Sequence, residues 1–165
     1  MLSEQQKIDT YKTLGLIAMD SGGGQLKVDW AMRLLEQGIE TQSLAVLATL
    51  QKFINEFEAD EYFSKVLSEL NIIHPNKTDA IQGYVKVVAS EVTEGITPPD
   101  VGASMIYRAN VNLDYPEYLG DFVSLDDEWY CEHINGWSVE QRASEIIKVC
   151  REVYGSISYP NLRSA

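Results

Sequence analysis

The sequence predicts an all-α fold, either a single compact antiparallel bundle or stacked helix pairs, with about seven helices. Apolar residues recur at three- and four-residue spacing along most of the chain, and helix-capping residues precede several of these stretches, notably Ser3, Thr41 and Ser138. No linker rich in Gly or Pro divides the sequence. We therefore expect one helical domain over residues 1–165.

Four helices are predicted in the first half of the chain, at 4–19, 29–38, 41–53 and 58–70. The first belongs to residues 1–20, and Gly38 is placed as the stop of the second. Between these two helices, Gly22-Gly23-Gly24 predicts a flexible linker. A phosphate-binding loop would need a Gly-Lys-Ser/Thr sequence after it, and Gln25 follows instead.

Three more helices are predicted in the second half, at 76–92, 99–109 and 138–154. The first of these is rich in β-branched residues, so a strand competes with the helix there. No alternation of apolar and polar residues supports that strand. Residues 110–136 are irregular, aromatic and acidic, and residues 155–165 are expected to form a frayed tail.

The inward faces of these helices predict the hydrophobic core. Its expected members are Trp30, Leu34, Leu47, Phe63, Leu67, Val88, Ile106, Ile146 and Cys150. The two cysteines, Cys131 and Cys150, cannot supply a disulfide framework or a four-ligand zinc site. Each lies in or beside an apolar pattern, which favours a small buried side chain over a reactive thiol.

The chain is strongly acidic, with a net charge of −12 from 25 acidic and 13 basic residues. Such a surface attracts basic proteins and repels phosphate backbones and anionic lipids, so we expect neither a nucleic-acid nor a membrane partner. The stretch from Leu34 to Leu47 has a helix-turn-helix outline, but its second helix offers no cation to DNA. Without a signal peptide or an apolar span, the cytoplasm is the expected location. The alternative explanation of the net charge is solubility alone, which accounts for such acidity in many bacterial cytosolic proteins.

Several landmarks between residues 28 and 130 resemble those of a known family. They are Trp30-Ala31, Leu34-Leu35, Gly38, Ser43-Leu44, Leu47-Ala48, Phe57-Glu58, Tyr62-Phe63, Gly95-Ile96, Pro99, Gly102-Ala103 and Leu125-Asp126-Asp127-Glu128. With these motifs the chain resembles a family of uncharacterised bacterial helical proteins of unknown function. The resemblance implies a helical fold and a bacterial origin, and it implies no functional residues.

The least ordinary region runs from Asn110 to Gln141, where acidic and aromatic residues alternate without any Lys or Arg. Aromatic side chains with a polar tip are enriched in binding hot spots, and carboxylates beside them steer basic partners. The residues predicted to bind a partner are Tyr115, Tyr118, Asp126, Asp127, Glu128, Trp129, Tyr130 and Trp137. The competing interpretation buries these rings in the core and leaves the carboxylates solvated.

Sites for metals or covalent catalysis find little support in the sequence. Asp126-Asp127-Glu128 lies near Cys131 and His133, but the ligand order of a calcium loop is missing and His74 is the only other histidine. Cys131 and His133 are too close in sequence for an ordinary nucleophile–base dyad. We therefore expect no cofactor and no tightly bound metal.

These observations favour a non-enzymatic, acidic protein–protein interaction domain, for example an inhibitor or immunity-type partner of a basic protein. The alternative is an enzyme or small-ligand-binding helical bundle with a pocket around His74, His133 or the Asp126–Glu128 turn. A scaffold of stacked helices with a purely structural role is a third interpretation. The sequence favours a protein without catalytic activity.

Overall fold

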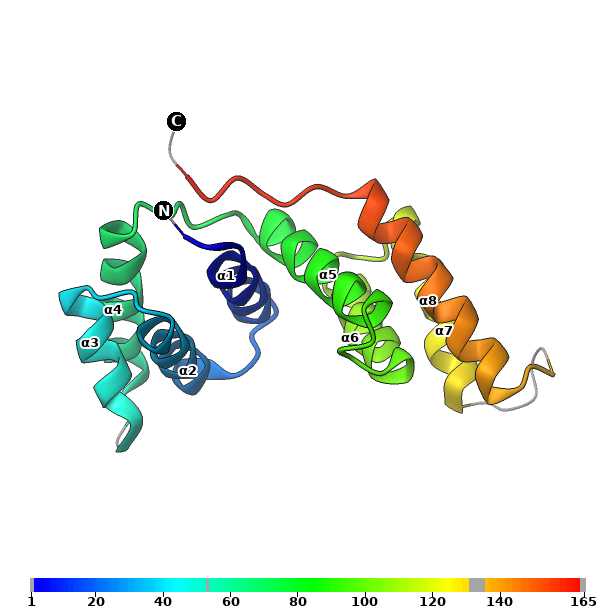
Figure 1. The fold of residues 1–165 in the computed structure, drawn as a ribbon, viewed down its shortest axis with the longest axis horizontal. Helices are drawn as coiled ribbons and strands as arrows, with labels where there is room; N and C mark the ends of the chain where they lie inside the picture. The colour runs from blue at the N-terminus through cyan, green and yellow to red at the C-terminus, as the bar shows by residue number, and fades with distance from the viewer. Residues whose placement is uncertain (1, 53, 131–135, 164–165) are drawn as a thin grey trace. The chain divides into compact units, whose positions relative to one another are not determined.

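The computed structural model describes residues 2–52, 54–130 and 136–163, and Figure 1 shows its helices. The all-α fold is confirmed: within these residues the ordered elements are helices, and one isolated antiparallel bridge joins Ile72 to Arg163. The elements are α1 (Glu4–Ala18), α2 (Gly23–Glu36), α3 (Gln42–Thr49), the 3-10 helix η1 (Leu50–Lys52), α4 (Glu56–Glu69), α5 (Lys77–Thr93), α6 (Pro99–Asn112), the 3-10 helix η2 (Glu117–Leu119), α7 (Asp121–Tyr130) and α8 (Val139–Ser156).

The chain divides into two compact units. The first comprises Met1–Ala80 and Pro160–Ala165, and the second comprises Ile81–Tyr159. The boundary therefore falls within α5, and the chain returns to the first unit at Pro160. The expectation of one helical domain over residues 1–165 stays a prediction.

Trp30 lies at the centre of the first unit and is fully buried. Its ring meets the ring of Phe63 edge to face, with 5.0 Å between the centroids. Its indole nitrogen donates a hydrogen bond to the Thr10 hydroxyl at 3.2 Å, and that hydroxyl donates to the carbonyl of Gln6. One side chain of α2 thus contacts both α1 and α4, while the Leu44 and Leu47 side chains of α3 complete this core.

The predicted caps are confirmed. Ser3 and Ser138 each form a capping box with a glutamine three residues later, and Thr41 accepts a hydrogen bond from the amide of Leu44. Before α5, Asn76 accepts a hydrogen bond from the amide of Asp79 at 2.9 Å. Local side-chain chemistry therefore sets these helix starts, as the sequence indicated.

The flexible linker predicted at Gly22-Gly23-Gly24 is wrong, because α2 begins at Gly23 and takes two of these glycines into its first turn. Packing explains the difference. A Cβ atom on Gly24 would lie 2.5 Å from Cγ2 of Ile54 and 3.1 Å from a carboxylate oxygen of Glu56. The glycines let the residues that precede α4 approach the start of α2 closely.

The second unit is built from the rest of α5 with α6, α7 and α8. Helix α6 contacts both α7 and α8, and α7 contacts α8. Its core includes Ile106, Phe122, Ile146 and Cys150, which are fully buried. The core residues predicted from the sequence are confirmed, since each of them is buried in one unit or the other. Among the described residues, no helix combines the length and apolar character needed to cross a membrane.

Two expectations for the second half of the chain need correction. Residues 110–136, expected to be irregular, contain the end of α6, η2 and the three-turn helix α7, whose Phe122 and Leu125 face inward. The frayed tail expected from residue 155 is also wrong for its described part. Helix α8 continues to Ser156, and Pro160–Arg163 packs in the first unit, where Leu162 is buried. The helix 76–92, for which a strand competed, is confirmed as α5.

Truncating a core side chain in either unit should cost stability. We expect Leu67→Ala in the first unit and Ile146→Ala in the second each to lower the free energy of unfolding by roughly 2–5 kcal/mol, because a cavity replaces buried methyl groups. Urea denaturation followed by circular dichroism measures the loss. A loss below about 0.5 kcal/mol for both variants would show that these faces are not core.

Two helical glycines should respond oppositely to alanine. At Gly102 in α6, an added Cβ would lie 2.1 Å from Cγ2 of Val92, so Gly102→Ala should destabilise the protein by about 1–3 kcal/mol through overpacking. Gly155 in α8 has no neighbouring atom within 4 Å of the added Cβ, so Gly155→Ala should stabilise by about 0.5–1 kcal/mol through helix propensity. Equal effects in urea denaturation would contradict the close α5–α6 contact.

Candidate functional site

The acidic and aromatic residues predicted to bind a partner lie in the second unit, on α7 and the segments before and after it. The structure places the backbone of Glu128, Trp129 and Tyr130 in the last turn of α7. Their side chains lie outside the description, as do Cys131, Glu132 and His133. The site is therefore built from its other members.

Most of the described carboxylates of this region face solvent. Asp114, Glu117, Asp121, Asp127 and Glu140 are exposed, and Asp126 is half-buried. Among the described residues, none of these six carboxylates forms an ion pair. Their charge is therefore available to a molecule that approaches from solvent.

The basic residue that follows this region, Arg142, is 6% exposed. Its guanidinium donates a hydrogen bond to the carbonyl of Trp137 at 3.0 Å and another to the carbonyl of Ser138. These contacts hold the turn that leads into α8.

Two tyrosines and two aspartates gather where α6, the turn after it and α7 meet. A hydrogen bond with Tyr115 raises the pKa of Tyr107, and the negative charges of Asp127 and Asp126 raise it further. Ser104 donates a hydrogen bond to the Asp126 carboxylate. The structure thus brings together three of the predicted residues, Tyr115, Asp126 and Asp127, and adds Tyr107 to them.

Tyr115 is the best exposed of the predicted aromatics whose side chains are described, at 53% of its surface. It follows Asp114, and both residues have left-handed backbone angles, with φ of 56° and 61°. Such angles are rare outside glycine and carry a cost in free energy. The turn nevertheless holds the Tyr115 ring at the surface beside Tyr107.

The other described aromatics of the region contribute less to this surface. Tyr118 is half-buried, and its hydroxyl accepts a hydrogen bond from Gln82 of α5 at 3.1 Å. Trp137 is half-buried beside a hollow of about 480 Å³ that Glu140, Glu145 and Lys148 also line. Phe122 is fully buried in the core. The described aromatics therefore divide between the surface and the core.

The residues of the alternative ligand site are divided between the two units. His74 is exposed in the first unit, and its Nδ1 lies 3.0 Å from the carbonyl of Pro75. Asp126 and Asp127 belong to the second unit, and His133 lies outside the description. Within the described residues, no group of three or more His, Cys, Asp and Glu side chains is arranged to hold a metal ion.

The structure shows hollows that sequence reasoning missed. In the first unit, a hollow of about 290 Å³ lies between the first turns of α1, the end of α4 and the Pro160–Arg163 segment. A second one of about 820 Å³ shares Leu2, Leu70 and Arg163 with it. No motif marks these residues in the sequence, because they come from three separate parts of the chain.

Comparisons with protein-family models, with curated proteins and with solved structures found no match to this chain. The resemblance to uncharacterised bacterial helical proteins, which depends on helix-packing motifs between residues 28 and 130, stays a prediction. Any functional conclusion must therefore come from the chemistry of the residues themselves.

Cys150 is fully buried in α8, and burial raises the pKa of its thiol to about 12. Its thiolate fraction at neutral pH is then about a thousandfold lower than that of an ordinary cysteine. An unreactive structural role follows from both its access and its protonation state.

A thiol-labelling experiment checks this role. In a Cys131→Ser variant, we expect a chromogenic thiol reagent to leave the native protein unmodified at mildly alkaline pH and to label one thiol per chain in denaturant. The converse variant, Cys150→Ser, is the control that isolates the other cysteine. Rapid labelling of the native Cys131→Ser protein would show that Cys150 is accessible and ionised.

Proposed function

We propose that this chain is a non-catalytic interaction domain whose second unit presents an acidic, tyrosine-bearing surface to a basic partner protein. The observation that supports it is the group of carboxylates without ion pairs, two exposed and one half-buried, around the Tyr107–Tyr115 pair. We call the residues Tyr107, Asp114, Tyr115, Asp126 and Asp127 the acidic surface.

Charge gives this surface a preference among partners. The whole chain carries a net charge of −12, and the carboxylates of the acidic surface lie in a stretch without Lys or Arg from 110 to 141. Long-range attraction accelerates the encounter with a basic protein, and the same field repels nucleic acids and anionic lipid head groups. A basic protein is therefore the partner that this surface fits.

Tyr115 gives the surface a binding anchor as well as charge. An exposed tyrosine supplies a large ring at low entropic cost, and Arg side chains favour stacking on such rings. The carboxylates of Asp126 and Asp127, whose charges act on the neighbouring Tyr107, can accept hydrogen bonds from a guanidinium or ammonium group. Arg or Lys side chains that enter between ring and carboxylates would combine both contributions.

This function corresponds to an inhibitor or immunity-type partner of a basic protein, in which the acidic domain covers a cationic surface. The proposal also covers a cytoplasmic setting and a bacterial origin, which follow from the sequence interpretation alone.

The proposal is tested by comparing the wild type and two triple variants as immobilised bait in extracts of the native host. A basic protein should be retained by the wild type and lost with Asp126→Asn/Asp127→Asn/Glu128→Gln. The control variant, Glu36→Gln/Glu40→Gln/Glu58→Gln, removes the same charge from exposed positions of the first unit and should retain the protein. If both triple variants lost the basic protein equally, net charge alone would account for its retention.

The purified partner then allows rates to be measured. The triple variant of Asp126, Asp127 and Glu128 should mainly slow association. Added salt should have the same effect on the wild type by screening. Tyr115→Ala should speed dissociation and weaken binding by more than about 1 kcal/mol, while urea denaturation shows unchanged stability. Unchanged affinity in both variants, measured by surface plasmon resonance, would contradict this placement of the binding site.

A further inference from the structure

The 290 Å³ hollow of the first unit has a charge opposite to that of the rest of the chain. Of its lining residues, two are charged, and both are cations: Lys7 of α1 and Arg163 of the C-terminal segment. In a protein with 25 acidic and 13 basic residues, a hollow lined by cations and by no carboxylate is unusual. We call it the cationic hollow.

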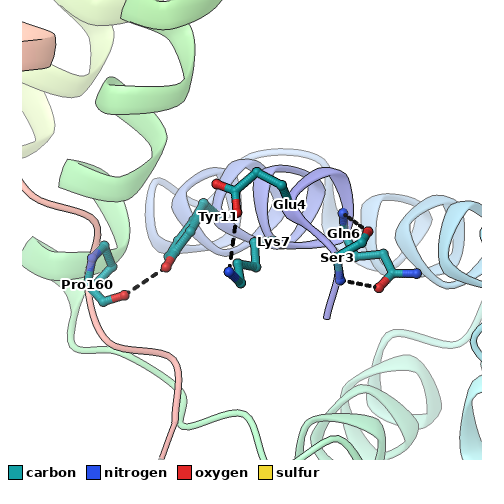
Figure 2. Close-up of polar contacts among 6 residues, drawn as sticks. All are labelled: Ser3, Glu4, Gln6, Lys7, Tyr11 and Pro160. Carbon is teal, nitrogen blue, oxygen red and sulfur yellow. Dashed lines mark hydrogen bonds and ion pairs between the residues drawn. The ribbon is translucent and has the colours of Figure 1, made fainter. Parts of the chain in front are cut away.

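The two cations of the cationic hollow are available to a ligand. Lys7 forms an ion pair with Glu4 at 3.2 Å, but both side chains are exposed, and pairs of this kind contribute little stability. Figure 2 shows Lys7 next to Tyr11 on α1, with the Glu4 carboxylate beside the Lys7 amine. The guanidinium of Arg163 has no partner among the described residues.

The remaining wall of the cationic hollow is apolar and is held in place. Leu2, Leu70, Ile72 and Leu162 contribute to it, and the last two are only 8% and 6% exposed. The C-terminal segment that carries Leu162 is fixed by two hydrogen bonds. The Tyr11 hydroxyl donates to the carbonyl of Pro160 at 2.9 Å, as Figure 2 shows, and the amide of Ile73 donates to the carbonyl of Leu162 at 2.9 Å.

From this combination we infer that the cationic hollow binds a small carboxylate with a short apolar chain. The chain would pack on the leucine and isoleucine side chains, and the carboxylate would lie between Lys7 and Arg163. The volume is at the lower end of the range for small-molecule sites, roughly 300–1,000 Å³, so the ligand is compact. Inorganic anions would leave the apolar wall uncovered, and cations would be repelled.

The neighbouring 820 Å³ hollow fits such a ligand less well. It also contains Arg163, but Glu40 lies in its wall and would repel a carboxylate. The cationic hollow involves residues of the first unit alone, so this inference does not depend on the proposed function of the acidic surface. If either the ligand site or the proposed function fails its test, the other is unaffected.

Titration of the full chain with octanoate, followed by backbone-amide NMR shifts and calorimetry, tests the inference. We expect saturable binding of one octanoate, with the largest shifts at Ile72, Ile73 and Leu162. Hexanoate should bind about fifteenfold more weakly, because each methylene removed from an apolar wall costs about fourfold in affinity. Octanol and octylammonium, which have the same chain without the negative charge, should bind at least tenfold more weakly than octanoate.

Matched variants separate this site from unspecific apolar binding. Arg163→Met and Lys7→Met keep an apolar stem and should each weaken octanoate binding at least fivefold. The control, Lys65→Met, removes another exposed unit-one lysine that pairs with a neighbouring carboxylate, and it should leave binding unchanged. Another hollow of the first unit is lined by Met32, Leu35 and Ala45. The inference would be overturned if octanol bound as tightly as octanoate, if the control variant lost as much affinity, or if the NMR shifts centred on that other hollow.

Discussion

The organisation of this chain depends on the attachment of its last described segment to its first unit. The amide of Ile73 donates to the carbonyl of Leu162, and the Tyr11 hydroxyl donates to that of Pro160. These contacts close the chain between residues 72 and 163 into one long loop that contains the whole second unit. Loop closure costs several kcal/mol of chain entropy at this length, roughly as the logarithm of the number of residues. Burial of Ile72 and Leu162 offsets part of that cost.

The same attachment forms the wall of the cationic hollow, since Pro160, Leu162 and Arg163 line one side of it. Stability and the candidate ligand site therefore share a few contacts in the first unit. The sequence did not show this, because a single leucine in a non-periodic tail gives no helical or strand pattern. Residues 155–165 looked frayed for that reason. Long-range pairing of short segments is the kind of information that local patterns lack.

Where the determinants are local, the sequence predicted the structure well. The capping side chains of Ser3, Thr41 and Ser138 act within one helical turn, and the core residues repeat at helical spacing. Helix α7 was missed because its ten residues carry just two buried positions in the described part, Phe122 and Leu125, among many acids. At Gly24 the deciding contact is with Ile54, which is distant in sequence. Tertiary packing placed those glycines in a helix against their propensity.

The candidate sites, too, could be predicted from the sequence only where their determinants are local. Composition alone indicated that residues 110–141 were acidic and aromatic, but it could not separate exposed Tyr115 from buried Phe122. Nor could composition show that Tyr107, which lies in the second half of α6, would be close to Tyr115. Such a juxtaposition depends on how the turn at Asp114 and Tyr115 reverses the chain, with two adjacent residues in left-handed conformations.

The second unit retains polar arrangements that a structure selected for stability alone would avoid. The amide of Asn110 is fully buried, and neither of its polar atoms has a partner in the part of the chain that the structure describes, which costs free energy. The left-handed pair begins four residues later and adds backbone cost next to the acidic surface. Arg142, the next basic residue in the sequence, is buried, and its guanidinium donates to the carbonyls of Trp137 and Ser138. Under the proposed function, a partner would supply contacts beside these carboxylates that the free protein lacks.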